Sequence, residues 1–269
     1  PPLVPNYGDV SLNGNITPYD GTLILQNVAG LIELDEQQQL NADVSGDSTI
    51  SPMDASYILQ YGVELIEEFP VESGSTILSA TGDYYMDYYS YNDGTQFDIP
   101  IYLENGSDIY SFEHHFFYDD EMISIDDISK GENIDDFLVY FNSEDSELIV
   151  VGASSYEDGI DGTFFTISGS ILDDDIYGTL TNIFIDEVRL NENEPDLYEE
   201  NYTTLVLNGI MGDLNSDNSL NVLDIVITAN IILELIEPTE YQLWAADING
   251  DGSYNILDIV ILANMVLFP

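Results

Sequence analysis

Oxygen-bearing side chains recur at a fixed spacing in four short acidic loops of this 269-residue chain. Counted from the first aspartate of each loop, they occupy positions 1, 3, 5, 7 and 12, and position 7 offers its backbone carbonyl. A tightly turned loop presents alternate residues to one centre, and the helix that follows supplies the closing carboxylate. The spacing therefore predicts four sites for a hard divalent cation, and Ca²⁺ is the natural ion. The predicted ligands are Asp9, Ser11, Asn13, Asn15 and Asp20; Asp43, Ser45, Asp47, Thr49 and Asp54; Asp213, Asn215, Asp217, Ser219 and Asp224; and Asp247, Asn249, Asp251, Ser253 and Asp258.

The four loops form two pairs with equal internal spacing. The loops of each pair start 34 residues apart, at Asp9 and Asp43 near the N-terminus and at Asp213 and Asp247 near the C-terminus. A single acidic loop could be an ordinary turn in which an aspartate caps its own backbone. Four loops in two equally spaced pairs indicate instead a duplicated unit of supersecondary structure.

The sixth loop position differs among the four loops. It usually takes glycine because the backbone turns sharply there with a positive φ. Ser48 occupies this position in the second loop and Asn218 in the third. Asparagine tolerates a positive φ better than serine does, so we expect the second loop to be distorted or to bind more weakly.

Each loop is followed by an apolar stretch that predicts a short helix. Pro18 and Pro52 lie two residues before the closing aspartate, where the first turn of a helix tolerates proline. No clear helix is expected before any loop. The last two predicted helices, 222–233 and 256–267, are almost wholly apolar. We expect such helices to be buried on more than one side.

The middle of the chain has a different pattern. The stretch FPVESGS at residues 69–75 predicts a linker, and short strand-like runs between Asn, Gly and Asp turns follow it. Such runs predict a β-sandwich or jelly roll, and therefore a multidomain α+β protein. The predicted strands are 83–91, 96–103, 109–118, 137–141, 148–151, 163–167, 180–188 and 203–207. The predicted domains are 1–69, 76–208 and 209–269.

The charge of the chain is strongly negative. Fifty-two Asp and Glu residues face two strong bases, Lys130 and Arg189, giving a formal net charge of −50. Such a balance excludes nucleic acid as a partner and argues against an anionic membrane surface. No apolar run is long enough to span a bilayer. Cations or salt must offset the self-repulsion, so a saline or calcium-rich extracellular medium fits best, and the start PPLVPNYG is typical of a mature secreted product.

Several other residue groups could carry chemistry. The tyrosines at 84, 85, 88, 89 and 91 could form a stacking platform for sugars, although on a strand they would point to both faces. His114 and His115 are adjacent, so we expect them to face opposite sides of a strand and share no metal. Lys130 and Arg189 are expected to form local ion pairs. No catalytic motif stands out, so an enzyme is not expected.

The duplicated loops resemble type I dockerin repeats, with Asp rather than Glu at position 12 and a helix after each loop. The central segment QFDIPIYLENGSDIYSFEHHFFYDDEMISI resembles the strands of a cohesin. The resemblance implies that the two kinds of module bind each other in a calcium-dependent way in extracellular scaffolds. The dockerin recognition positions, 10 and 11 of each loop, correspond to Pro18, Tyr19, Pro52, Met53, Val222, Leu223, Ile256 and Leu257. Dockerins often have hydroxyl residues there, so in this chain we expect mainly apolar contacts.

One chain thus combines a receptor-like β domain with two ligand-like modules. If the C-terminal module of one copy binds the β domain of the next, the contact is head-to-tail and builds rings or open filaments. Our leading hypothesis is a calcium-stabilised extracellular polymer of this protein. One alternative is a non-polymerising adaptor that binds other cohesin- or dockerin-bearing proteins, and another is a carbohydrate-binding adhesin. Whether the N-terminal module packs within its own chain stays open.

Overall fold

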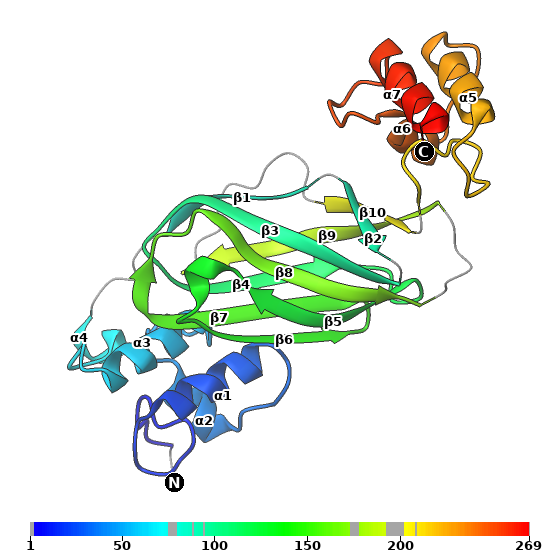
Figure 1. Ribbon diagram of the computed structural model, residues 1–269. Helices are drawn as coiled ribbons and strands as arrows, with labels where there is room; N and C mark the ends of the chain where they lie inside the picture. The colour runs from blue at the N-terminus through cyan, green and yellow to red at the C-terminus, as the bar shows by residue number, and fades with distance from the viewer. Residues whose placement is uncertain are drawn as a thin grey trace.

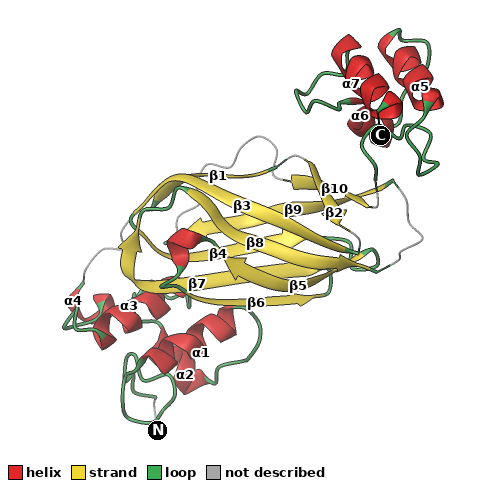
Figure 2. Cartoon of the chain, viewed as in Figure 1, coloured by secondary structure: helices red, strands yellow, loops and turns green. Residues whose placement is uncertain are grey.

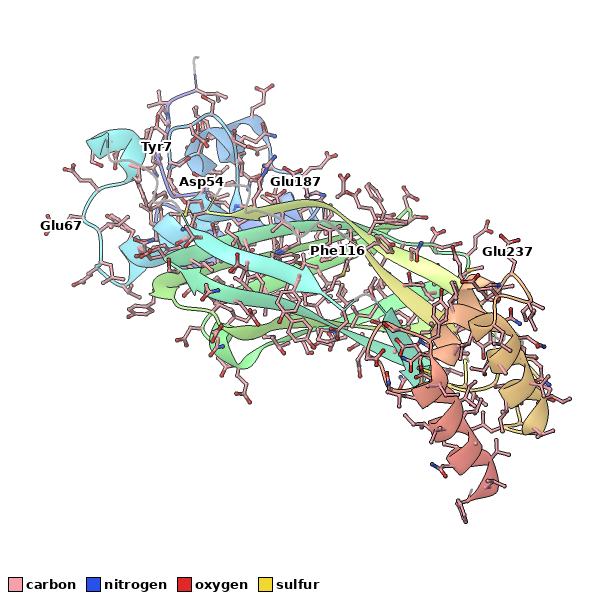
Figure 3. The ribbon with its side chains drawn as sticks, turned by 90° about the horizontal axis from the view of Figure 1, so that it is seen from above. Tyr7, Asp54, Glu67, Phe116, Glu187 and Glu237 are labelled. Atoms are coloured by element: carbon pink, nitrogen blue, oxygen red, sulfur yellow. The ribbon has the colours of Figure 1, made fainter. Side chains whose placement is uncertain are left out.

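The protein consists of a central β-sandwich with a small helical module at each of two opposite ends (Figures 1 and 2). This arrangement, taken from a computed structural model, confirms the predicted α+β architecture. In the view from above, Asp54 and Glu237 lie at opposite ends of the molecule (Figure 3). The structure describes residues 3–74, 80–87, 89–93, 95–172, 178–191, 202–207 and 209–268.

The N-terminal module contains four helices: α1 (Pro18–Val28), α2 (Glu36–Ala42), α3 (Pro52–Gly62) and α4 (Pro70–Ser73). The long helices α1 and α3 pack against each other. The prediction of a linker at residues 69–75 was wrong for its first part. Phe69 is buried there and stacks on Tyr61, with ring centroids 4.9 Å apart, so the module continues into α4.

A short helix precedes the second loop of each pair, where no helix was predicted. These helices are α2 and α6 (Glu240–Ala246), each seven residues long. Asp35 and Thr239 start them, because their side chains accept hydrogen bonds from backbone N–H groups of the first turn. A helix of two turns has too few apolar positions to show a clear periodicity, which explains the wrong prediction.

The described residues of the central domain form ten strands in one continuous sheet that folds into two layers. One layer contains β1, β3, β8 and β5, and the other contains β10, β9, β4, β7 and β6. Strand β2 joins them, since it pairs with β3 antiparallel and with β10 parallel. The strands are β1 (Thr81–Met86), β2 (Tyr89–Asp93), β3 (Gln96–Ser107), β4 (Ile109–Phe117), β5 (Ile123–Lys130), β6 (Leu138–Glu144), β7 (Glu147–Asp158), β8 (Gly162–Ile171), β9 (Thr179–Leu190) and β10 (Tyr202–Leu207).

Two predictions of strands were wrong in detail. Strand β5 was not predicted, because its sequence ISIDDISK interrupts the apolar alternation with two acids at a register shift. The run predicted at 83–91 divides into β1 and β2, with Tyr88 outside the described residues.

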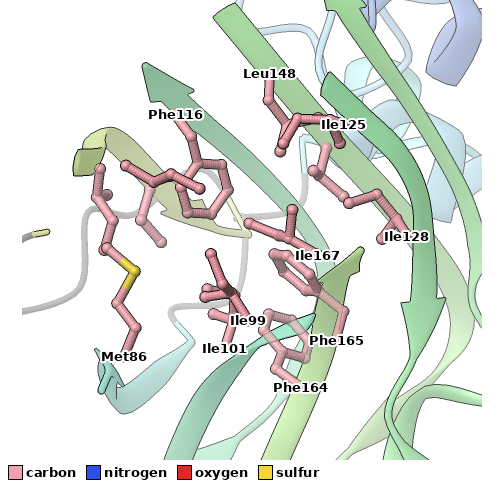
Figure 4. Packing of buried hydrophobic residues seen from close by; sticks show 14 of the residues in the cluster. Met86, Ile99, Ile101, Phe116, Ile125, Ile128, Leu148, Phe164, Phe165 and Ile167 are labelled. Atoms are coloured by element: carbon pink, nitrogen blue, oxygen red, sulfur yellow. The ribbon is translucent and has the colours of Figure 1, made fainter. Parts of the chain in front are cut away.

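The main core lies between the two layers (Figure 4). Ile99 and Ile101 of β3 and Phe165 and Ile167 of β8 come from one layer, and Phe116 of β4 comes from the other. All five side chains are buried. Alternate residues of each strand supply this core, which leaves the other half of each strand on an outer face.

The two outer faces differ in chemistry. On β3 and β5, Asp98 and Asp126 accept hydrogen bonds from serine hydroxyls of β8, and both bonds are exposed. The second layer instead carries an apolar area on β6, β7 and β4, which we call the docking face. Its residues are Ser111, Leu138, Tyr140, Ile149, Val151, Ala153 and the backbone carbonyl of Ser154. Only a face of the second kind suits an apolar helix pair.

The C-terminal module contains α5 (Val222–Ile232), α6 and α7 (Ile256–Leu267). The two long helices start as predicted, and α5 ends one residue earlier. Trp244 of α6 and Val206 of β10 belong to one buried cluster, which connects the module to the sandwich. The prediction that α5 and α7 are buried on more than one side was wrong within this chain, since one side of each lies in solvent.

Candidate calcium loops and docking surfaces

The closing aspartate of each loop is also the third residue of the helix that follows. In α1, for example, Asp20 Oδ2 accepts a hydrogen bond of 2.8 Å from the backbone N–H of Thr17, which precedes the helix. The other carboxylate oxygen, Oδ1, accepts a bond from the N–H of Ser11, at loop position 3. The same two bonds recur in the other three loops, at 2.8–3.2 Å. One carboxylate thus starts the helix and closes the loop.

The first aspartate of each loop organises the loop's other half. In the first, third and fourth loops its two oxygens accept bonds from the N–H groups of positions 5 and 6, at 2.7–3.2 Å. Positions 4 and 6 have a positive φ in all four loops. The residues with positive φ are Leu12, Gly14, Gly46, Ser48, Ser216, Asn218, Gly250 and Gly252. All four predicted loops therefore share one backbone conformation.

The second loop differs from the other three in one hydrogen bond, although Asp43 Oδ2 still accepts a bond of 3.2 Å from the N–H of Ser48. Ser48 has a φ of 76°. Asp43 Oδ1 accepts its bond from the N–H of Gly46, at position 4, where the other loops use position 5. The loop geometry imposes the positive φ, which a serine adopts only with strain, because its Cβ disfavours this region.

The donor set of the loops suits a hard cation. The closing aspartates Asp20, Asp54, Asp224 and Asp258 are fully buried. Ser11 Oγ, a predicted ligand, is buried without a hydrogen-bond partner among the described residues, so its lone pairs are available to an ion. No three His, Asp or Glu side chains in the described part of the chain are placed to share a metal, so each set needs its Ser, Asn or Thr residues and the position-7 carbonyl. These residues fit Ca²⁺, which binds six to eight oxygens.

The N-terminal module packs on the docking face of its own chain (Figure 1). Met53 of α3 is 1% exposed, and its Sδ accepts a weak hydrogen bond from Ser111 Oγ at 3.6 Å. Ser56 Oγ donates a buried bond of 2.7 Å to the carbonyl of Ser154. Val151 belongs to the same buried cluster as α1 and α3, so module and sandwich share one core.

The predicted recognition residues of this module divide into two groups. Pro52 and Met53, from the second loop, are buried against the sandwich. Pro18 and Tyr19, from the first loop, are exposed, Tyr19 by 59%. Ser56 was not predicted as a recognition residue, since a serine inside an amphipathic helix gives no signal of a partner 98 residues away.

The C-terminal module displays the corresponding surface to solvent. The recognition residues Val222, Leu223, Ile256 and Leu257 are all more than half exposed. Val226 and Val260, one turn further along α5 and α7, are also more than half exposed. We call these six residues the aliphatic face. It carries no charge, because Asp224 and Asp258, the only ionisable residues of the two helices, are fully buried.

A charged band crosses the same sheet beside the docking face. His115 Nε2 lies 3.0 Å from Glu113 and Nδ1 lies 2.9 Å from Glu147, and these hydrogen bonds raise the pKa of His115 to about 9. Arg189 forms an ion pair of 2.5 Å with Glu187, as predicted. Lys130 was wrongly expected to do so. Among the described residues it donates to the backbone carbonyls of Asp135 and Phe137 instead.

His114 faces the core, opposite to His115, as predicted. It is fully buried among Phe112, Phe164 and Phe165, and burial lowers its pKa to about 3. Neither ring nitrogen has a hydrogen-bond partner among the described residues. His114 is therefore neutral near pH 7.

The tyrosine cluster does not form one surface. Tyr84 is buried and stacks on His114 at 5.0 Å, whereas Tyr85 stacks on Tyr102 at 5.0 Å and donates to Glu104. Tyr88 lies outside the described residues, and only the backbone of residues 89 and 91 is described. Tyr84 thus belongs to the core.

Comparison with known proteins agrees with the loop geometry. Residues 7–61 and 211–267 match the dockerin type I domain, which confirms the predicted resemblance. The chain therefore carries a dockerin type I domain at each end. Dockerin domains are non-catalytic modules and in general bind calcium. No curated protein sequence matches the chain.

Solved cohesin structures match about half of the chain. A cohesin module of a family 33 glycoside hydrolase from Clostridium perfringens has a TM-score of 0.39 and 16% identity, covering 49% of this chain and all of the module. A type I cohesin–dockerin complex from Clostridium thermocellum has a TM-score of 0.39 and 18% sequence identity, and the match covers 47% of this chain and 99% of the matched chain. A non-cellulosomal cohesin from Archaeoglobus fulgidus has a TM-score of 0.38 and 14% sequence identity, and the match covers 48% of this chain and 91% of that cohesin. In the described residues, no helix has both the length and the hydropathy needed to cross a membrane.

Proposed function

We propose that this protein is an extracellular structural subunit that joins copies of itself head to tail. In this function the C-terminal dockerin module of one copy docks on the β domain of the next. The observation that carries the proposal is the aliphatic face: six large side chains, each more than half exposed, on two adjacent helices. An uncharged apolar surface of this kind on a highly charged protein is typical of a protein–protein contact.

The placement of the modules supports an open chain of copies. The two modules lie at opposite ends of the sandwich (Figure 1). A contact between different surfaces at opposite ends repeats from copy to copy without closing on itself, unless the rotation per copy forms a ring. The same contact between two surfaces at one end would stop at a dimer.

Calcium would act by ordering the loops that start α5 and α7. The side-chain oxygens of Asp213, Asn215, Asp217 and Asp224 would hold one ion, and the fourth loop would hold another. Without a cation the buried carboxylates are balanced by neutral donors such as backbone N–H groups and, for Asp20, the hydroxyl of Thr17, since the chain has two strong bases in all. Bound ions also reduce the self-repulsion of a chain with a formal charge of −50, which suits a calcium-rich extracellular medium.

The proposal is tested by sedimentation and electron microscopy of the whole protein at high protein and calcium concentration. We expect long assemblies that dissociate in a calcium chelator. The double variant Val226→Asp/Val260→Asp places two charges on the aliphatic face and should prevent assembly. A monodisperse monomer under these conditions would contradict the proposal.

A second candidate function is an adaptor that binds another cohesin-bearing protein and does not polymerise. The covered docking face favours it, because this apolar outer face of the sandwich is already occupied by the chain's own α1 and α3. Under this function the C-terminal module would bind a β domain of another protein, and the chain alone would stay monomeric.

A further inference from the structure

The α7 half of the aliphatic face occupies the same loop and helix positions as the surface that α3 of the N-terminal module has buried. The last loops of the two modules place Leu257 at the position of Met53 and Val260 at that of Ser56. Met53 is 1% exposed and Leu257 is 57% exposed. The structure thus shows what this surface of α3 packs against, whereas the corresponding residues of α7 are uncovered. Pro18 and Tyr19 of α1 are exposed, like their counterparts on α5.

The docking face suits a second helix pair better than the other outer areas of the sandwich. The outer face of β3, β5 and β8 carries exposed carboxylates, among them Asp98 and Asp126. Part of β4 and β9 carries the band of Glu113, His115 and Arg189. At the end of the same strands the exposed Phe117 and Phe184 line an open pocket together with Asp119. Covering either area with valines and leucines would remove charges from water without replacing their partners.

We propose that the N-terminal module is a built-in competitor for assembly. The docking face that its helices cover is the face that the C-terminal module of a second copy takes, so copies join by exchanging one module for the other. The inference rests on the proposed function, in which the C-terminal module binds the β domain of another copy. The inference adds which face of the β domain the C-terminal module binds. It also explains why a single chain, whose own N-terminal module covers that face, associates only weakly.

The N-terminal module has two advantages in this competition. The first is the hydroxyl of Ser56, which satisfies the buried carbonyl of Ser154, whereas Val260 or Val226 would leave that carbonyl unpaired. The second is its covalent connection to the sandwich, which gives it an effective concentration on the order of millimolar. At lower protein concentrations the closed single chain therefore predominates, and weakening the N-terminal contact should promote association.

The substitution Ser56→Val tests this prediction with little risk to the fold, because the equivalent positions of α5 and α7 are valines in this same chain. The variant loses the bond to the Ser154 carbonyl and the bond that Ser56 Oγ accepts from Gln60 Nε2. Leaving one buried carbonyl unpaired changes an equilibrium about five- to hundredfold. We expect the concentration of half-association in calcium, measured by analytical ultracentrifugation, to fall by that factor. The matched control is Thr22→Val at the equivalent position of α1, where the hydroxyl bonds only to Pro18 of its own helix among the described residues. The control should leave association unchanged.

Exchange can also be observed directly, because the chain contains no cysteine. A thiol introduced by Met53→Cys is shielded in the closed chain, where residue 53 is 1% exposed. We expect its alkylation rate to rise at least tenfold when the protein assembles in calcium. A thiol introduced by Val63→Cys, at a position 46% exposed, should react equally in both states.

The double variant Val226→Asp/Val260→Asp separates the two proposals, with the emission of Trp244 showing that its C-terminal module is folded. If association occurs and needs Val226 and Val260, but Ser56→Val has no effect and the thiol at position 53 stays shielded, the inference is overturned and the proposed function stands. If no variant associates, the proposed function fails and the inference fails with it. Stronger association of Ser56→Val, together with exposure of the thiol at position 53, supports both.

Discussion

The two dockerin modules share the same loops and helices but differ in what their helices contact. Those of the N-terminal module lie on the sandwich, where Met53 and Ser56 are buried. Those of the C-terminal module lie in solvent, with Leu257 and Val260 more than half exposed. The loops therefore determine how a module folds, and a few helix residues determine what it binds. Such a division lets a duplicated unit acquire two different partners.

The modules also differ in how they depend on the sandwich. Val151 and Ala153 of β7 lie in one buried cluster with the N-terminal helices. The C-terminal cluster includes only Val206 as a fully buried residue of the sandwich. The N-terminal module should therefore unfold together with the sandwich, whereas the C-terminal module has a small core of its own and depends more on its ions.

Calcium removal should show the largest difference between the modules. A loop at a calcium concentration 100-fold above its dissociation constant gains about 2.7 kcal/mol, so two loops contribute about 5 kcal/mol. Trp244, the single tryptophan, is 6% exposed in the C-terminal module and reports on that module and on its contact with Val206 of β10. We expect a chelator to shift its emission to longer wavelength while hydrogen exchange in α3 stays slow. If hydrogen exchange in α3 became fast at a lower chelator concentration than the one that shifts the Trp244 emission, the N-terminal module would be the more calcium-dependent of the two.

A matched pair of charges should give the next largest effect. Met53→Asp places a carboxylate in the shared core and should destabilise the protein by roughly 3–4 kcal/mol. Leu257→Asp places the same group on a side chain that is 57% exposed, so the change should stay within about 0.5 kcal/mol in the monomer. Thermal unfolding at low protein concentration measures both. Equal effects would show that the N-terminal module is not docked in solution.

Acid should destabilise the sandwich and its docked module before the C-terminal module. Burial lowers the pKa of His114 to about 3 from an ordinary value of 6.5. Below pH 6.5, His114 therefore binds a proton in the unfolded chain but stays neutral in the folded chain. The contribution of neutral His114 to the free energy of unfolding is complete above pH 6.5. It falls by about 1.4 kcal/mol per pH unit as the pH drops toward 3.

The variant His114→Phe supplies the control for this titration. It removes the ionisable ring and should flatten the dependence of unfolding free energy on pH between 6.5 and 4, as measured by chemical denaturation. The C-terminal module contains no histidine, so hydrogen exchange in α5 and α7 should not follow this titration. An unchanged slope in the variant would exclude His114 as its source.

The smallest effect concerns the sixth loop position. Ser48 has a φ of 76°, and Gly252 has a φ of 79° at the same position of the fourth loop. Ser48→Gly should relieve about 0.5–1 kcal/mol of strain and raise the calcium affinity of the second loop about two- to fivefold. Gly252→Ser should lower the calcium affinity of the fourth loop by a similar factor, because serine is strained at this φ. A Cβ there meets no neighbour within 4 Å, so backbone strain is the only change. Calorimetric titration of both variants checks the pair.

The sequence was informative wherever the structure is local. The ligands of each loop lie within twelve residues, and the aspartate that closes the loop also caps the helix, so spacing alone predicts the four loops and the starts of α5 and α7. The elements that were not predicted are short or irregular. Helices α2 and α6 have two turns each, and β5 contains acids at a register shift.

The docking of the N-terminal module could not be predicted from the sequence for a different reason. The bond from Ser56 to Ser154 joins residues 98 positions apart, and neither residue stands out in its own element. The apolar character of α5 and α7 led to the wrong expectation that both are buried. Hydrophobic patterns show that a surface needs a partner, but they do not show whether the partner is in the same chain.

The stoichiometry of the surfaces has a consequence for any assembly of this protein. Each copy has one docking face and two helix pairs that could cover it. However the pairs are distributed among copies, their number exceeds the number of faces by one per copy. Under the proposed exchange, every subunit of a fibre would therefore keep one helix pair with no face to cover, and the fibre would bind any other protein with a comparable sandwich along its whole length.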